Sequence, residues 1–268
     1  MINIQYKGRL GNNLIQYAAA YILTKRSGLT LNTLPEVSYS NKGRQKTSYS
    51  DAIKTSIDFG SVFNIQPSIG QSYSKTIELD DTNYYKHLNN PLKDTGYQLN
   101  GFFQDGRLLC DYRSDILDLY QYKTQPKIEI SQDDAFFACR FGDCLLNPRT
   151  YCSIEYIESQ LTGNLHNYRN IYLTSDTLDH PPLVEFIEKY NITPYNNDPL
   201  KTILFAKNFN NLILSAGSFS YWIAYLSEAT NVTVFNNQTQ DLMVDHTKRD
   251  PLQLQNAWNY NKDVNFSL

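Results

Sequence analysis

The chain of 268 residues, with 41% hydrophobic and 19% charged side chains, is long enough for one large or two small domains. Its formal net charge of −3 argues against binding to nucleic acid or to a membrane surface. No stretch reaches the roughly 18–20 apolar residues of a membrane-spanning helix, and the first residues lack the pattern of a secretory signal. We therefore expect a soluble, cytoplasmic protein without an integral membrane segment.

The side chains that usually bind metals are scattered. The cysteines form no C-x-x-C pair, and no histidine has a carboxylate or serine at a suggestive spacing. We therefore expect no metal and no disulfide framework, and packing roles for the cysteines. The residues concerned are Cys110, Cys139, Cys144, Cys152, His87, His166, His180 and His246.

The N-terminal half begins with a predicted strand over residues 2–6, a glycine-containing turn over 7–12 and a helix over 13–27 that Gly28 ends. A second strand is predicted over residues 29–34. The signal is weak from residue 35 to residue 94, where polar residues dominate. A strand over 97–103, a helix over 108–120 and a linker over 123–127 follow.

The C-terminal half alternates strands and helices more clearly. The strands are predicted over residues 135–140, 170–174, 211–215 and 232–235, and helices begin at 153, 181, 199 and 218. This alternation indicates a parallel sheet with helices on both faces. We thus expect an α/β protein of two halves, residues 1–125 and 126–268, with ligands bound at the carboxyl ends of the strands.

The loop after the first strand contains Gly8, Arg9, Gly11 and Asn12, directly before a helix. Its glycines would let the backbone approach a ligand closely, and the helix N-terminus offers free N–H donors to an anion. A plain strand-to-helix turn with two glycines has the same pattern, so both interpretations stay open. The loop is neither a dinucleotide fingerprint nor a P-loop, because it lacks the third glycine and the Gly-Lys-Ser/Thr sequence.

The loop after the apolar strand 135–140 contains Arg140, Gly142 and Asp143. The C-terminal half carries 10 basic and 16 acidic residues, so an anion site there must depend on local features. A guanidinium has the planar fork of donors that suits a diphosphate. A structural ion pair with Asp143 is the alternative, and Asp143 is also a candidate general base.

Two further loops carry candidate residues. Ser175 and Asp176 follow a strand, where the carboxylate could accept a hydrogen bond from a nucleoside or simply cap the next segment. Ser218 and Phe219 begin a helix after a small-residue turn, which favours an anion at the helix N-terminus. An ordinary N-cap role for Ser218 is equally compatible with the pattern.

Taken together, these segments resemble the α-1,2-fucosyltransferases of glycosyltransferase family 11. The similarity extends over nearly the whole chain, and the five motifs occur in the family's order. They are KGRLGNNLIQYA at residues 7–18, GFFQ at 101–104, ACRFGD at 138–143, YLTSD at 172–176 and SFSYWIA at 218–224. Ala138 and Phe141 depart from the family's His-x-Arg-Arg pattern, in which they replace the histidine and the second arginine.

The resemblance implies a GT-B-like fold, in which two Rossmann-like halves with parallel sheets face each other across a cleft. It also implies metal-independent transfer of fucose, with inversion, from GDP-fucose to a hydroxyl of a glycan acceptor, through an α-1,2 linkage to galactose. Arg140 would contact the donor diphosphate. The other donor-side residues would be Gly11, Asn12, Ser175, Asp176, Ser218 and Phe219, and residues 1–125 would bind the acceptor.

The departures at Ala138 and Phe141 leave two alternatives open. The chain could be a glycosyltransferase with another nucleotide-sugar donor, since the family's histidine helps to hold the guanine. It could also be a non-catalytic glycan-binding protein on a transferase fold, although the retained Arg140 argues against such a loss of activity.

Overall fold

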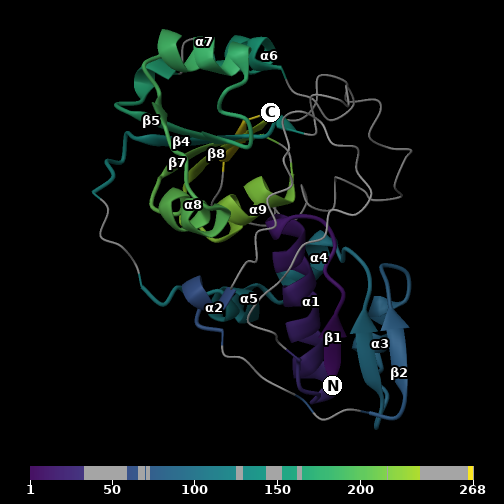
Figure 1. Cartoon of the computed structure of the whole chain (residues 1–268). Helices are drawn as coiled ribbons and strands as arrows, with labels where there is room; N and C mark the ends of the chain where they lie inside the picture. The colour runs from purple at the N-terminus through teal and green to yellow at the C-terminus, as the bar shows by residue number, and fades with distance from the viewer. Residues whose placement is uncertain are drawn as a thin grey trace. The chain divides into compact units, whose positions relative to one another are not determined.

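The computed structural model describes residues 1–32, 59–65, 70, 73–124, 129–142, 153–161, 165–215, 217–235 and 265–267. These residues divide into two compact units (Figure 1). Unit 1 contains the described residues up to 124, and unit 2 contains those from 129 on. Each unit has its own parallel sheet, so the α/β class predicted from the sequence is confirmed. The GT-B-like arrangement of two halves across a cleft stays a prediction.

Unit 2 contains a six-stranded parallel sheet in its described residues, in the order β6-β5-β4-β7-β8-β9. Counted along the chain, this order is 3-2-1-4-5-6, that of a doubly wound sheet, whose direction of winding reverses between β4 and β7. The strands are β4 (Ala135–Cys139), β5 (Ile171–Ser175), β6 (Thr193–Pro194), β7 (Asn211–Ser215), β8 (Asn231–Phe235) and β9 (Asn265–Ser267).

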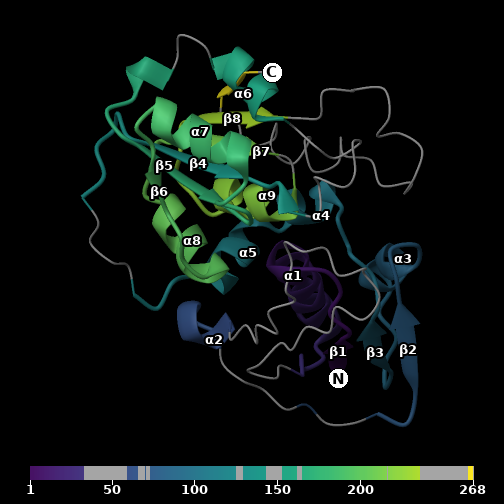
Figure 2. The ribbon, with the colours of Figure 1, turned by 45° about the horizontal axis from the view of Figure 1, so that its top comes forward.

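Helices cover both faces of this sheet, as the sequence predicts (Figures 1 and 2). One face carries α6 (Ile154–Leu161) and α7 (Pro181–Lys189), and the other carries α8 (Pro199–Ala206) and α9 (Ser218–Tyr225). The Ser153 hydroxyl accepts a hydrogen bond from the Tyr156 amide at 3.2 Å, which caps the start of α6.

The core of unit 2 is built on β4, in which every residue is buried. Successive side chains of a strand point to opposite faces, so Phe137 packs on the α7 side and Phe136 on the α8 side. The Phe137 ring lies 6.1 Å from that of Phe186 in α7, and the Phe136 ring lies 5.9 Å from that of Phe205 in α8. A strand buried on both faces explains the unbroken apolar sequence of residues 135–139.

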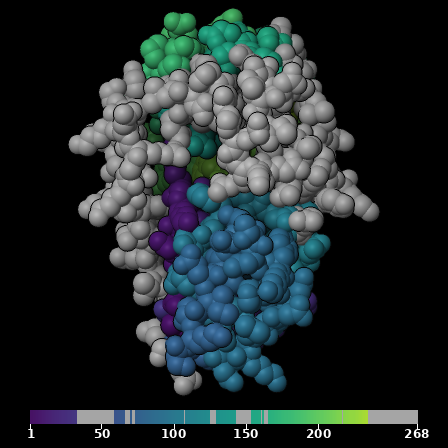
Figure 3. Space-filling model, turned by 90° about the vertical axis from the view of Figure 1, so that its right-hand side faces the viewer, coloured from purple at the N-terminus to yellow at the C-terminus, as the bar shows by residue number. Residues whose placement is uncertain are grey.

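Unit 1 contains a three-stranded parallel sheet in its described residues, in the order β1-β3-β2. The strands are β1 (Ile2–Ile4), β2 (Thr76–Leu79) and β3 (Gly96–Leu99), and the helices are α1 (Leu10–Ser27), α2 (Phe59–Val62), α3 (Tyr84–Asn89), α4 (Gly106–Asp111) and α5 (Arg113–Leu119). On the face shown in Figure 3, the described surface of unit 1 is formed mainly by β2, α3 and their neighbours (blue).

Buried tyrosines fix the central helix α1. The Tyr84 hydroxyl of α3 donates to the Ala19 carbonyl at 2.8 Å, and the Tyr120 hydroxyl, directly after α5, donates to the Leu14 carbonyl at 2.6 Å. Both tyrosines are 1% exposed, so the hydrogen bonds satisfy hydroxyls that would be costly to bury alone. Gly28 ends α1 with a φ of 70°, in the left-handed conformation that glycine adopts readily.

Several predictions for unit 1 need correction. The described part of the strand predicted over 29–34 is reduced to a single bridge between Leu31 and Ile2. The helix predicted over 108–120 is two helices, because the backbone of Tyr112 leaves the helical region at φ −115° and ψ 26°. The strand predicted over 97–103 is observed as β3 and ends at Leu99, and α2, β2 and α3 were not predicted, since they lie in the segment with a weak signal. None of the helices in the described residues is long and apolar enough to cross a membrane.

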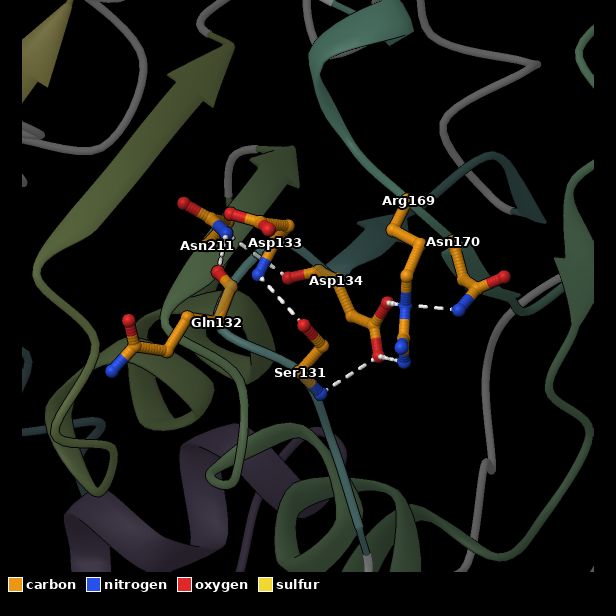
Figure 4. Close-up of polar contacts among 7 residues, drawn as sticks. All are labelled: Ser131, Gln132, Asp133, Asp134, Arg169, Asn170 and Asn211. Atoms are coloured by element: carbon orange, nitrogen blue, oxygen red, sulfur yellow. Dashed lines mark hydrogen bonds and ion pairs between the residues drawn. The ribbon is translucent and has the colours of Figure 1, made fainter.

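A polar cluster closes the amino-terminal edge of the unit 2 sheet (Figure 4). The Asp134 carboxylate is buried and accepts hydrogen bonds from Arg169 at 3.1 Å to each oxygen, from the Ser131 amide and from Asn170, both at 2.9 Å. Burial alone would raise the pKa of Asp134, but these hydrogen bonds outweigh it and lower the pKa below its ordinary value. Asp134 therefore stabilises the fold in its charged form.

We expect Asp134→Asn to lower the free energy of unfolding at neutral pH by about 2–3 kcal/mol, because the Arg169, Ser131 and Asn170 donors lose their charged acceptor at this buried position. The wild-type advantage is present above the ordinary aspartate pKa of about 4. It is lost as the pH falls through the lower pKa of the folded protein. Urea unfolding from pH 7 to the acid range measures this difference. Asp133→Asn, at the exposed neighbouring position, is the control, and equal effects of the two substitutions would contradict the assignment.

Candidate functional site

The candidate site lies at the carboxyl end of β4. Two backbone amides there lie beyond the last residue of the strand. The Arg140 amide donates to the Ser215 hydroxyl of β7, and the Phe141 amide donates to the Asp176 carboxylate after β5, both at 2.9 Å. These side chains take the place of the backbone acceptors that a longer sheet would provide. Both flanking strands thus fix the backbone that carries the Arg140 side chain.

The Arg140 side chain lies beside the start of α9. Its Nη1 atom is 3.5 Å, and its Cδ atom 3.9 Å, from the position that a Cβ atom would occupy on Gly217. Gly217 is the N-cap of α9 and has a φ of 137°, a conformation that residues with a side chain rarely adopt. A guanidinium and a helix N-terminus both favour negative charge, so this arrangement suits an anion. It lies between β4 and β7, where a doubly wound sheet binds ligands.

Gly142 leaves room for the carboxylate that holds this loop. A Cβ atom at residue 142 would collide with Oδ2 of Asp176, the residue whose Oδ1 accepts from the Phe141 amide. The Asp176 carboxylate can therefore take this position only because Gly142 has no side chain. The hydrogen bond from the Phe141 amide joins Asp176 to the loop after β4, 35 residues away, instead of capping the segment that follows Asp176, and the contact of Asp176 with a nucleoside stays a prediction.

The remaining predicted residues of unit 2 lie in the same loops. The Ser175 hydroxyl accepts from the Thr177 amide at 3.2 Å and shapes the turn after β5. Ser218 and Phe219 are the first two residues of α9, and both are half-buried. The interpretation of Ser218 as the N-cap is wrong, because Gly217 occupies that position. Asp143 lies outside the described residues.

Gly11 and Asn12 belong to unit 1, where they lie in the first turn of α1. The predicted helix therefore begins three residues earlier than expected, at Leu10. The Asn12 Oδ1 atom accepts a hydrogen bond from the side-chain Nε2 atom of Gln104 at 2.6 Å. The Asn12 side chain also fills the space that a side chain at Gly8 would need, and Gly8 has a φ of 77°.

The two departures from the family pattern are both buried. Ala138 lies within β4 and is 1% exposed, and the Phe141 side chain is fully buried with its ring 5.4 Å from that of His180. Position 141 thus contributes to the core, so Arg140 alone carries the positive charge of this motif.

In the part of the chain that the structure describes, no group of three histidine, cysteine or acidic residues could hold a metal ion.

Sequence reasoning missed Ser215 as a site residue. The only signal was a hydroxyl at the end of the apolar strand Asn211–Ser215, and its partner, the Arg140 amide, is 75 residues away in the chain.

We expect Gly142→Ala to destabilise the protein by about 1–3 kcal/mol, because the new methyl group displaces the Asp176 carboxylate from the Phe141 amide. In the double variant Gly142→Ala, Asp176→Ala the collision no longer occurs. Its loss in free energy of unfolding should therefore be smaller than the sum of the two single losses. Urea denaturation of all four proteins measures this coupling, and strictly additive losses would refute the placement of Asp176.

A comparison with known protein families identifies the family of the chain. A family model described as Glycosyl transferase family 11 matches residues 1–262 of the 268. No curated protein matches the chain significantly. The family match includes every predicted site residue, in both units. Because it covers almost the whole chain, the protein belongs to glycosyl transferase family 11 and is a glycosyltransferase, which works with a nucleotide-sugar donor and a glycan acceptor.

Proposed function

We propose that the protein is an inverting, metal-independent fucosyltransferase that transfers fucose from GDP-fucose to a galactose hydroxyl of a glycan, in an α-1,2 linkage. The observation that supports this proposal best is the Arg140 side chain beside the N-terminus of α9, at the carboxyl end of the sheet. Family membership supports the fucosyltransferase type.

In the proposal, Arg140 and the first amides of α9 bind the donor diphosphate. Ser218 and Phe219 flank this position, and Ser175 and Asp176, at the end of the neighbouring strand β5, face the nucleoside. The C-terminal half has an excess of acidic residues, so the local combination of a guanidinium and a helix terminus must provide the attraction. Gly11 and Asn12 are assigned to the donor side by resemblance alone.

The proposed reaction forms a bond between the acceptor oxygen and C1 of fucose while the bond from C1 to the β-phosphate oxygen breaks. The hydroxyl proton leaves to a base, for which Asp143 is the candidate from the sequence. Negative charge grows on the leaving diphosphate, and Arg140 would neutralise it. One well-placed donor of this kind contributes about 3–4 kcal/mol, or roughly 10²–10³ in rate.

Positions 138 and 141 give one reason to consider another donor, because both carry buried apolar side chains. At the position of the family's histidine, the methyl group of Ala138 has no polar atom for a guanine. A different nucleotide sugar is therefore the second candidate, and a panel of GDP-, UDP- and CDP-sugars separates the two.

We expect Arg140→Ala to reduce kcat for transfer at least about 100-fold while the fold is preserved, because the leaving group loses its cation. Arg140→Lys should retain part of the activity, since it keeps the charge but not the fork. Arg26→Ala, at an exposed position in the last turn of α1, is the control. Mass-spectrometric detection of glycan products gives the rates. Near-normal turnover of a folded Arg140→Ala variant would overturn the proposal.

A further inference from the structure

The turn that follows β3, residues 100–104, is held by side chains from three other segments of unit 1. The Lys7 ammonium donates to the Asn100 carbonyl at 3.0 Å, and the Gln16 side-chain amide donates through Nε2 to the Gly101 carbonyl at 2.9 Å. The Asp81 carboxylate, just after β2, accepts from the amides of Phe102 and Phe103. The turn therefore cannot move independently of β1, α1 and β2.

This turn also contains an unusual backbone conformation. Phe103 has a φ of 52°, which is a genuine outlier for a bulky residue. Its ring is 4% exposed and lies 5.0 Å from the ring of Tyr84, while its amide is bound to Asp81. Both ends of the residue are thus fixed, and the surrounding structure holds Phe103 in a conformation that it would not adopt alone. Such outliers concentrate at ligand-binding positions.

The buried side-chain amides of Asn13 and Gln16 join this turn to the loop after β1. Asn13 and Gln16 are fully buried in α1, an expensive position for polar groups unless their hydrogen bonds are satisfied. The Gln16 Oε1 atom accepts from the Lys7 amide at 3.1 Å and from Asn13 Nδ2 at 3.2 Å, and Asn13 Nδ2 also donates to the Lys7 carbonyl at 3.1 Å. Satisfied buried networks of this kind make a structure rigid.

The result of these contacts is a fixed pair of amide side chains at the carboxyl ends of β1 and β3. Gln104 donates to Asn12, which rests on Gly8, and both Gln104 and Asn12 are half-buried. An amide both donates and accepts hydrogen bonds, which matches the hydroxyl groups of a sugar. The pair carries no charge, and the Lys7 ammonium of the loop after β1 is bound to the Asn100 carbonyl, so the pair suits a neutral sugar better than a diphosphate.

We propose that Gln104 binds a hydroxyl of the acceptor glycan and that Asp81 is a positioning residue, which holds the turn that presents Gln104. This inference rests on the proposed function. It assigns the acceptor contact to the carboxyl edge of the unit 1 sheet, and it replaces the donor-side assignment of Asn12, which rests on resemblance, by the task of orienting Gln104.

The test uses the full chain, GDP-fucose and the terminal-galactose glycan that the wild-type protein labels best on an array. Gln104→Ala and Asp81→Ala should each raise the acceptor KM by at least about tenfold, as the loss of well-placed hydrogen bonds does. The donor KM and the slow hydrolysis of GDP-fucose should stay unchanged. Asp81→Asn should remain within about twofold of the wild type, because its Oδ1 atom can still accept from both amides.

Asp115→Ala is the control, since it removes an aspartate from an exposed ion pair with Lys25 in the same unit. An unchanged acceptor KM in a folded Gln104→Ala variant would overturn the assignment of Gln104. An Asp81→Ala effect on the donor KM instead of the acceptor KM would overturn the assignment of Asp81. These outcomes differ from failure of the proposed function, in which the wild-type protein neither hydrolyses GDP-fucose nor transfers its sugar.

Discussion

The hydrogen bonds that hold the backbone after β4 are the constraint on which the candidate site depends. A strand that ends in the interior of a sheet leaves amides that need acceptors. Here Ser215 and Asp176, from the strands on either side, provide them for Arg140 and Phe141. The absence of a side chain at Gly142 makes the arrangement possible, since it admits the Asp176 carboxylate, and Gly217 beside the Arg140 side chain adopts a φ of 137° that residues with a side chain rarely adopt. A single cation is thereby fixed beside a helix N-terminus.

The same physical solution recurs in unit 1. There the side chains of Lys7, Gln16 and Asp81 satisfy backbone groups of the turn after β3, and they fix an amide pair instead of a cation. In both units, polar side chains hold irregular backbone at the carboxyl ends of parallel strands. The opposite edge of the unit 2 sheet has a different role, because the Asp134 cluster closes it and contributes stability.

The sequence predicts the fold best where a segment is buried on both faces. The strand Asn211–Ser215 was predicted with its observed bounds, and β4 within one residue, because unbroken apolar runs give a strong signal. The strand β2 was missed, since Thr76 and Glu78 are exposed and the segment has a polar composition. The site could be predicted as a set of loops but not as a geometry: the bonds from Ser215 and Asp176 join residues 75 and 35 positions apart. The burial of Phe141 was equally invisible in the sequence.

Isothermal titration calorimetry with GDP and GMP measures whether Arg140 recognises the outer phosphate of the donor. With Arg140 at that phosphate, the wild-type protein should bind GDP at least about tenfold more tightly than GMP, a difference of roughly 1.4 kcal/mol. Arg140→Ala should nearly abolish this preference while binding of GMP changes little. An equal preference for GDP in the two proteins would show that Arg140 does not recognise the outer phosphate.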